Sequence, residues 1–150
     1  CACGGVVRGG GEAIDIEPVG NPLVLKQLTC IHRMRPGALI RASVLLGGMC
    51  CAGASKEALQ RLDEYANCIG LAFQIQDDIL DVVADTETLG KPQGSDQLQN
   101  KPTFPSLLGL DGARERALAL HHQAMDCLNI FDDAADTLRQ LSAYIVERGH

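Results

Sequence analysis

The sequence lacks tryptophan and has few aromatic residues of any kind. Phe, Tyr and Trp together make up 3% of its 150 residues. Cores of β-sheets draw on aromatic and β-branched side chains, whereas Ala and Leu favour helices. The most strand-like runs, Val6–Val7 and Leu23–Leu25, are too short to build a sheet. The composition therefore predicts an all-α fold, and the length suits one compact domain.

Positive charge is also scarce. The chain has 13 Lys and Arg residues against 19 Asp and Glu residues, which gives a formal net charge of −6. A nucleic-acid partner is therefore not expected, since no basic stripe is present to neutralise a phosphate backbone. A small phosphorylated ligand remains compatible, because one or two lysines and bridging metal ions suffice to hold it.

Long hydrophobic runs and paired cysteines are missing as well. The most apolar stretch, Ala38–Ala54, is interrupted by Arg41 and is shorter than the roughly 20 residues that a membrane helix needs. No secretory signal is evident. The seven cysteines are odd in number and form no Cys-x-x-Cys pair, so we expect free thiols in a reducing, cytoplasmic setting without membrane association.

Apolar spacing and helix-boundary residues predict five helices. Ser55 is a suitable N-cap for a long helix over residues 56–83, and Asp132 or Asp133 for the last one. A polar loop is expected over residues 85–103, where Gly and Pro are frequent. The other expected helices cover residues 23–34, 36–51, 112–130 and 133–147.

The segment Phe73–Asp81 carries the most informative pattern. Asp77 and Asp81 are four residues apart, so they share one face of a helix, and Gln74 joins that face. Asp78 lies about 100° further round. Like charges at this spacing repel by roughly 0.2–0.5 kcal/mol per pair, which a bound cation would relieve. Mg²⁺ prefers one or two carboxylates together with substrate phosphates.

Basic side chains that could accompany such a cation occur on both sides of this segment. Lys91 and Lys101 lie in the predicted loop, and Arg33 and Arg35 lie at an upstream helix break. Together they could surround a diphosphate and stabilise it as a leaving group. Spacing alone leaves a plain solvated acidic face as the more common interpretation of Asp-Asp-x-x-Asp.

Further segments, in a fixed order, settle the choice between these interpretations. The chain resembles the trans-isoprenyl diphosphate synthase family, and bacterial farnesyl diphosphate synthases within it. The resemblance spans nearly the whole chain. The matching segments are Gly10-Gly11-Glu12, His32–Ile40, Phe73–Asp81, Thr88–Lys91 with Asp96, and Lys101–Pro105.

The resemblance implies a helical bundle around a central cavity and a homodimer. It implies condensation of isopentenyl diphosphate with an allylic diphosphate, dependent on Mg²⁺ or on Mn²⁺ in its place. Asp77 would bind the metal with support from Asp78 and Asp81. The residues that would hold or line the allylic substrate are Arg35, Phe73, Gln74, Lys91 and Lys101, with Gln74 and Lys91 assisting catalysis beside Asp77.

Three positions depart from the family pattern. Arg35 stands where the family has Lys, Pro36 where it has Thr, and Glu12 where it has Gln. The family's first aspartate-rich motif, its isopentenyl diphosphate site and its determinants of product length lie upstream of these residues. We therefore expect residues 1–150 to be the C-terminal half of one polyprenyl synthetase domain and to be inactive alone. The alternative is a non-catalytic partner subunit that modulates a synthase.

Overall fold

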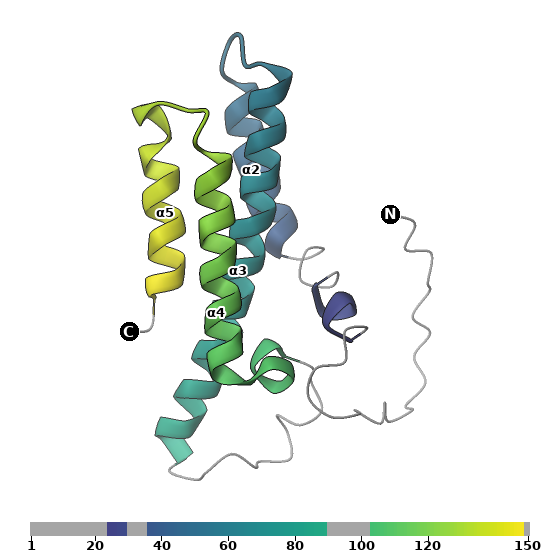
Figure 1. Cartoon of the computed structure of the whole chain (residues 1–150), viewed down its shortest axis with the longest axis vertical. Helices are drawn as coiled ribbons and strands as arrows, with labels where there is room; N and C mark the ends of the chain where they lie inside the picture. The colour runs from purple at the N-terminus through teal and green to yellow at the C-terminus, as the bar shows by residue number, and fades with distance from the viewer. Residues whose placement is uncertain (1–23, 30–35, 90–102, 149–150) are drawn as a thin grey trace.

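A computed structural model describes residues 24–29, 36–89 and 103–148. It contains the helices α2 (Pro36–Met49), α3 (Lys56–Leu89), α4 (Phe104–Cys127) and α5 (Asp136–Glu147). A 3-10 turn precedes α5, and residues 24–29 are helical. These residues contain no strand, which confirms the all-α prediction. The long helix α3 runs beside α2 and α4, and α5 lies next to α4 (Figure 1).

Helix α3 is the centre of the bundle, and it contacts α2, α4 and α5. Tyr65 is fully buried in it, and its hydroxyl donates a hydrogen bond of 2.7 Å to the carbonyl of Leu138 in α5. Burial raises the pKa of this phenol. Small buried residues on α4 allow this helix to approach α3 closely. The remaining core side chains of α3 and α4 are mostly Ala, Leu and Ile: Ala66, Ile69, Leu71, Ala72, Ile75, Ile79, Phe104, Leu107, Ala113, Ala117, Leu120 and Ala124.

The α2–α3 crossing depends on two glycines. A Cβ placed on Gly70 would lie 3.0 Å from the Cα of Gly37, so the two backbones approach more closely than any larger residue permits. An ion pair between Arg41 and Asp63 joins the same two helices.

Helix boundaries follow local capping chemistry. Ser55 Oγ accepts from the N–H of Ala58 at 3.0 Å, and Asp132 Oδ1 accepts from the N–H of Ala134 at 3.0 Å, so both predicted caps are confirmed. The start predicted for the polar loop is wrong, because α3 continues to Leu89.

The start predicted for the fourth helix is also wrong. Helix α4 begins at Phe104, since Thr103 and Ser106 form a reciprocal capping box and Pro105 fits the first turn. Gly109 interrupts this helix with a φ of 74°. Pro105 and Gly109 therefore mark the capped start of α4 and a kink within it.

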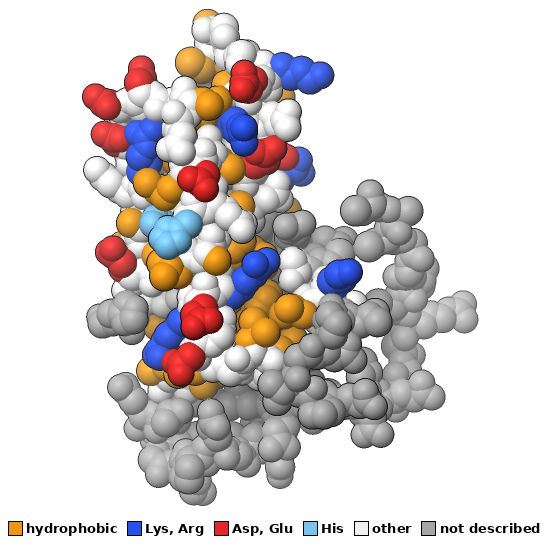
Figure 2. Space-filling view, in the orientation of Figure 1, with side chains coloured by type: hydrophobic (Ala, Val, Ile, Leu, Met, Phe, Trp, Pro, Cys, Tyr) orange, Lys and Arg blue, Asp and Glu red, His pale blue; other side chains and the backbone are white. Residues whose placement is uncertain are grey.

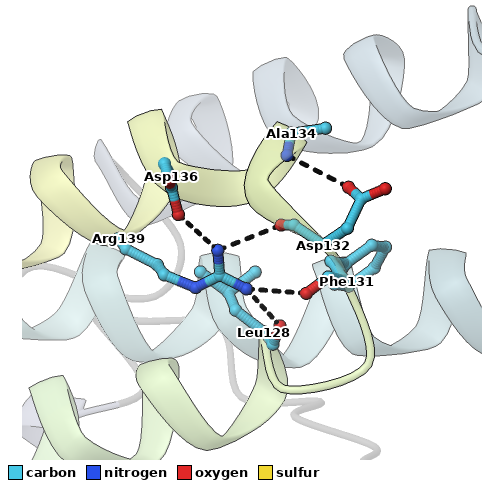
Figure 3. A network of polar contacts seen from close by, with 6 residues as sticks. All are labelled: Leu128, Phe131, Asp132, Ala134, Asp136 and Arg139. Carbon is cyan, nitrogen blue, oxygen red and sulfur yellow. Dashed lines mark hydrogen bonds and ion pairs between the residues drawn. The ribbon is translucent and has the colours of Figure 1, made fainter.

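Arg139 holds the turn between α4 and α5 together (Figure 3). Its guanidinium donates to the carbonyls of Leu128, Phe131 and Asp132 at 2.9, 2.8 and 3.0 Å, and to Asp136 Oδ1 at 2.6 Å. The last carbonyls of a helix have no partner within the helix. The Arg139 side chain thus provides hydrogen-bond donors for the carbonyls of the turn and fixes the start of α5.

Two histidines lie side by side on α4 (Figure 2). His122 is exposed, whereas His121 is half-buried and its Nδ1 lies 2.8 Å from Ser142 Oγ of α5. Burial, and to a lesser degree His122, lowers the pKa of His121. Within the described ranges the cysteines at positions 50, 51, 68 and 127 form no disulfide. In the same ranges no helix combines the length and apolar character needed to cross a membrane.

Candidate metal and diphosphate site

The carboxylates of Asp77 and Asp81 project from consecutive turns of α3. The side chain of Asp77 is 39% exposed, and Asp81 is exposed. Gln74 lies one turn before Asp77, and its Nε2 is 3.5 Å from Asp77 Oδ2, at the outer limit of a hydrogen bond. The predicted stripe of Gln74, Asp77 and Asp81 on one accessible helix face is thus present.

Asp78 has a different position from its neighbour. It is buried, and its Oδ2 accepts a hydrogen bond of 3.1 Å from the backbone N–H of Phe104, the first residue of α4. A carboxylate at a helix N-terminus satisfies an unpaired N–H and favours the helix dipole. Asp78 therefore links α3 to α4. This contact gives it a structural task in addition to the metal-supporting role that the sequence predicts.

Arg148, which directly follows α5, forms an ion pair with Asp77 Oδ1. Its guanidinium carbon also lies 4.5 Å from the centre of the Phe73 ring, within the range of a cation–π contact. Arg148 was not among the predicted site residues, and 71 positions separate it from Asp77. The sequence signal for it is its place as a basic residue just after the last predicted helix, where the family resemblance implies that such a residue approaches the substrate.

A cavity of about 420 Å³ lies beside this ion pair, between α3, α4 and α5. Gln76 and Glu147 line it together with His121 and Arg114, whereas Asp77 does not. This cavity is thus separate from the Asp77–Asp81 face.

Three of the predicted substrate-binding residues, Arg35, Lys91 and Lys101, lie outside the described residues. Within residues 24–29, 36–89 and 103–148, no three acidic, His or Cys side chains converge on one metal position. On the accessible face of α3 beside Gln74, Asp77 and Asp81 offer the hard oxygen ligands that Mg²⁺ prefers. Because Mg²⁺ often takes one or two carboxylates and completes its shell with water and phosphate, this donor set fits such an ion.

The sequence model of the Polyprenyl synthetase family matches residues 7–142. The chain belongs to the polyprenyl synthetase family. It is 49% identical to farnesyl diphosphate synthase of Escherichia coli (strain K12) over 142 residues, which is 93% of this chain and 48% of that protein. It is 47% identical over 114 residues to farnesyl diphosphate synthase of Geobacillus stearothermophilus, covering 76% of this chain and 38% of the relative.

A solved polyprenyl synthetase structure agrees with this assignment. The FPP/GFPP synthase from Zymomonas mobilis, in its apo form, superposes with a TM-score of 0.66 at 35% identity, over 88% of this chain and 40% of the other. The chain spans about half the length, or less, of these relatives. The family resemblance and its all-α fold are thereby confirmed.

Proposed function

We propose that this chain supplies the metal–diphosphate half of the active site of a short-chain prenyltransferase. The reaction joins isopentenyl diphosphate to an allylic diphosphate, dimethylallyl or geranyl. The product is farnesyl diphosphate, on the support of the names of the relatives. The observation that supports this function best is the pair of accessible carboxylates, Asp77 and Asp81, on one face of α3 in a chain of this family.

Asp77 is the principal metal ligand in this proposal, and Asp81 supports it from the next turn. A bound Mg²⁺ or Mn²⁺ would neutralise negative charge on the diphosphate as its bond to the allylic carbon breaks. Gln74, which reaches the same carboxylate, would orient Asp77 and donate to a phosphate oxygen. Asp78 would fix the direction of α3 through its bond to the start of α4.

Basic side chains and one aromatic ring would hold the allylic substrate. Lys91, Lys101 and Arg35 would donate to the diphosphate, where cationic groups stabilise the departing anion. The Phe73 ring, one turn before Asp77, would line the pocket near the isoprenoid carbons, and an aromatic face favours positive charge on them. The upstream half of the domain would supply the isopentenyl diphosphate site and the second metal-binding motif, and a homodimer is the expected assembly.

Metal-dependent binding of an allylic diphosphate analogue to the complete protein tests this function. We expect Asp77→Asn to weaken binding at least tenfold in the presence of Mg²⁺, and to leave the weak metal-free binding unchanged. The matched control is Asp111→Asn, which removes an exposed carboxylate on α4. Equal affinity of the wild type and Asp77→Asn, or binding that needs no metal, would defeat the assignment.

A further inference from the structure

The carboxylate proposed as the metal ligand already has a cation beside it. Arg148 Nη2 pairs with Asp77 Oδ1, and 71 positions separate the two residues in the sequence. A guanidinium on this oxygen and a divalent cation on the same oxygen would repel each other and compete for the same lone pairs. Occupation of Asp77 by a metal ion therefore has to displace Arg148 or weaken its contact.

Arg148 is held in place by contacts besides the ion pair. Its guanidinium lies over the ring of Phe73, and its backbone carbonyl accepts a hydrogen bond from Gln76 Nε2. Its own N–H donates to the carbonyl of Tyr144 at 3.1 Å, which ends α5. Phe73, Gln76 and Asp77 thus form a receptor on α3 for the residue that follows α5.

This arrangement is also incomplete, which favours reversibility. The Nε–H of Arg148 is buried, and no acceptor for it exists within the part of the chain that the structure describes. An unsatisfied buried donor reduces the net stability of a contact. The paired side chains of Arg148 and Asp77 are 27% and 39% exposed, and partly exposed ion pairs are weak.

We propose that Arg148 is a latch: a resident counter-cation that occupies Asp77 while no metal is bound, and leaves when a divalent cation binds. Metal binding then releases the C-terminal end of α5 from Phe73 and Gln76. By linkage, release of the latch strengthens metal binding by the same factor by which metal binding favours release. This inference rests on the proposed function, since it needs Asp77 to be a metal ligand.

The first test is a titration of the complete protein with Mn²⁺ in the absence of any diphosphate, with free Mn²⁺ followed by electron paramagnetic resonance. Arg148→Gln removes the competing charge, so we expect its Mn²⁺ affinity to be about two- to fivefold higher than that of the wild type, the factor that a partly exposed ion pair provides. Arg148→Lys keeps the charge and should lie near the wild type. The matched control is Arg41→Gln, which breaks another interhelical Arg–Asp pair far along α3 and should change nothing.

The second test needs no metal ion. Asp77→Asn should free Arg148 and speed tryptic cleavage of the Arg148–Gly149 bond about two- to fivefold, measured by mass spectrometry in a limited digest. Asp81→Asn is the control, because Asp81 lies on the same face and makes no ion pair within the described residues. In the wild type, added Mn²⁺ should accelerate the same cleavage.

The outcomes separate the latch from the proposed function. Mn²⁺ binding that depends on Asp77 but is unchanged or weaker in Arg148→Gln overturns the latch and leaves the metal site intact. Cleavage rates that are equal in Asp77→Asn, Asp81→Asn and the wild type also overturn the latch. Absence of Mn²⁺ binding to Asp77 overturns the latch and the proposed function together.

Discussion

Substitution of Gly70 by alanine measures how closely α2 and α3 must approach. The added Cβ would lie 3.0 Å from Gly37 Cα, which is backbone and cannot rotate away. Overpacking of this kind costs about 1–3 kcal/mol, whereas Ala in place of Gly in a helix stabilises by about 1 kcal/mol. Gly47, on α2, provides the matched control, because nothing lies within 4 Å of its added Cβ.

The two alanine variants share the gain in helix propensity, so their difference isolates the packing cost. We expect Gly47→Ala to be more stable than the wild type by about 0.5–1 kcal/mol, and Gly70→Ala to be less stable than Gly47→Ala by about 1–3 kcal/mol. Urea unfolding of the complete protein, followed by far-UV circular dichroism, gives both values. Equal stability of the two variants would refute the close backbone contact between Gly37 and Gly70.

Two further predictions concern the junction of α4 and α5. Arg139→Gln should lower the free energy of unfolding by about 2–3 kcal/mol in urea, since it leaves helix-terminal carbonyls without a donor. The control Arg114→Gln removes only an exposed ion pair at 3.4 Å and should stay within about 0.5 kcal/mol of the wild type. Similar losses in both variants would contradict the capping role of Arg139. His121 has a folded-state pKa below its usual value of 6.5, because its partial burial and the neighbouring His122 disfavour the charged ring and outweigh the opposite effects of Glu147 and Ser142. The unfolded chain therefore binds more protons, so the contribution of His121 to stability should be full above about pH 6.5 and fall as the pH drops below it. His121→Asn should lose this part of the pH dependence, measured as urea midpoints between pH 5 and 8. An unchanged pH profile in the variant would rule out His121 as its source.

Local sequence signals were sufficient for most of the helices and for the stripe on α3. A side chain on a helix has its direction fixed by its position, so the shared face of Gln74, Asp77 and Asp81 follows from a spacing of three and four residues. Caps at Ser55 and Asp132 are equally local, since a side-chain oxygen there reaches an N–H two or three residues later.

The errors concern where two helices end and begin. The loop was predicted to reach residue 103 and the next helix to start near residue 112, although Thr103 and Ser106 form a capping box and Pro105 suits a first turn. Helix α3 ends at Leu89, beyond the apolar positions on which its predicted end at residue 83 rested, because local propensity is a weak guide to where a helix ends.

The contact of Arg148 with Asp77 could not be predicted from sequence spacing. No periodicity relates a residue beyond α5 to a turn of α3, and the contact depends on how two helices pack at long range in sequence. Two residues receive it: Phe73, which the family resemblance gave as a pocket wall, and Gln76, for which the sequence predicted no role. Their shared contact to one arginine appears only in three dimensions.

The adjacent carboxylates Asp77 and Asp78 show how a helix divides similar groups between different tasks. A rotation of about 100° per residue directs Asp78 inward to the N–H of Phe104 and leaves Asp77 on the accessible face with Arg148. An inward carboxylate must find a fixed donor, because burial without one is costly. An accessible carboxylate with a weak partner can exchange that partner for a metal ion. The fixed contact of Asp78 and the exchangeable contact of Asp77 are therefore complementary. The first holds α3 in position, and the second leaves the Asp77 carboxylate able to bind a metal ion.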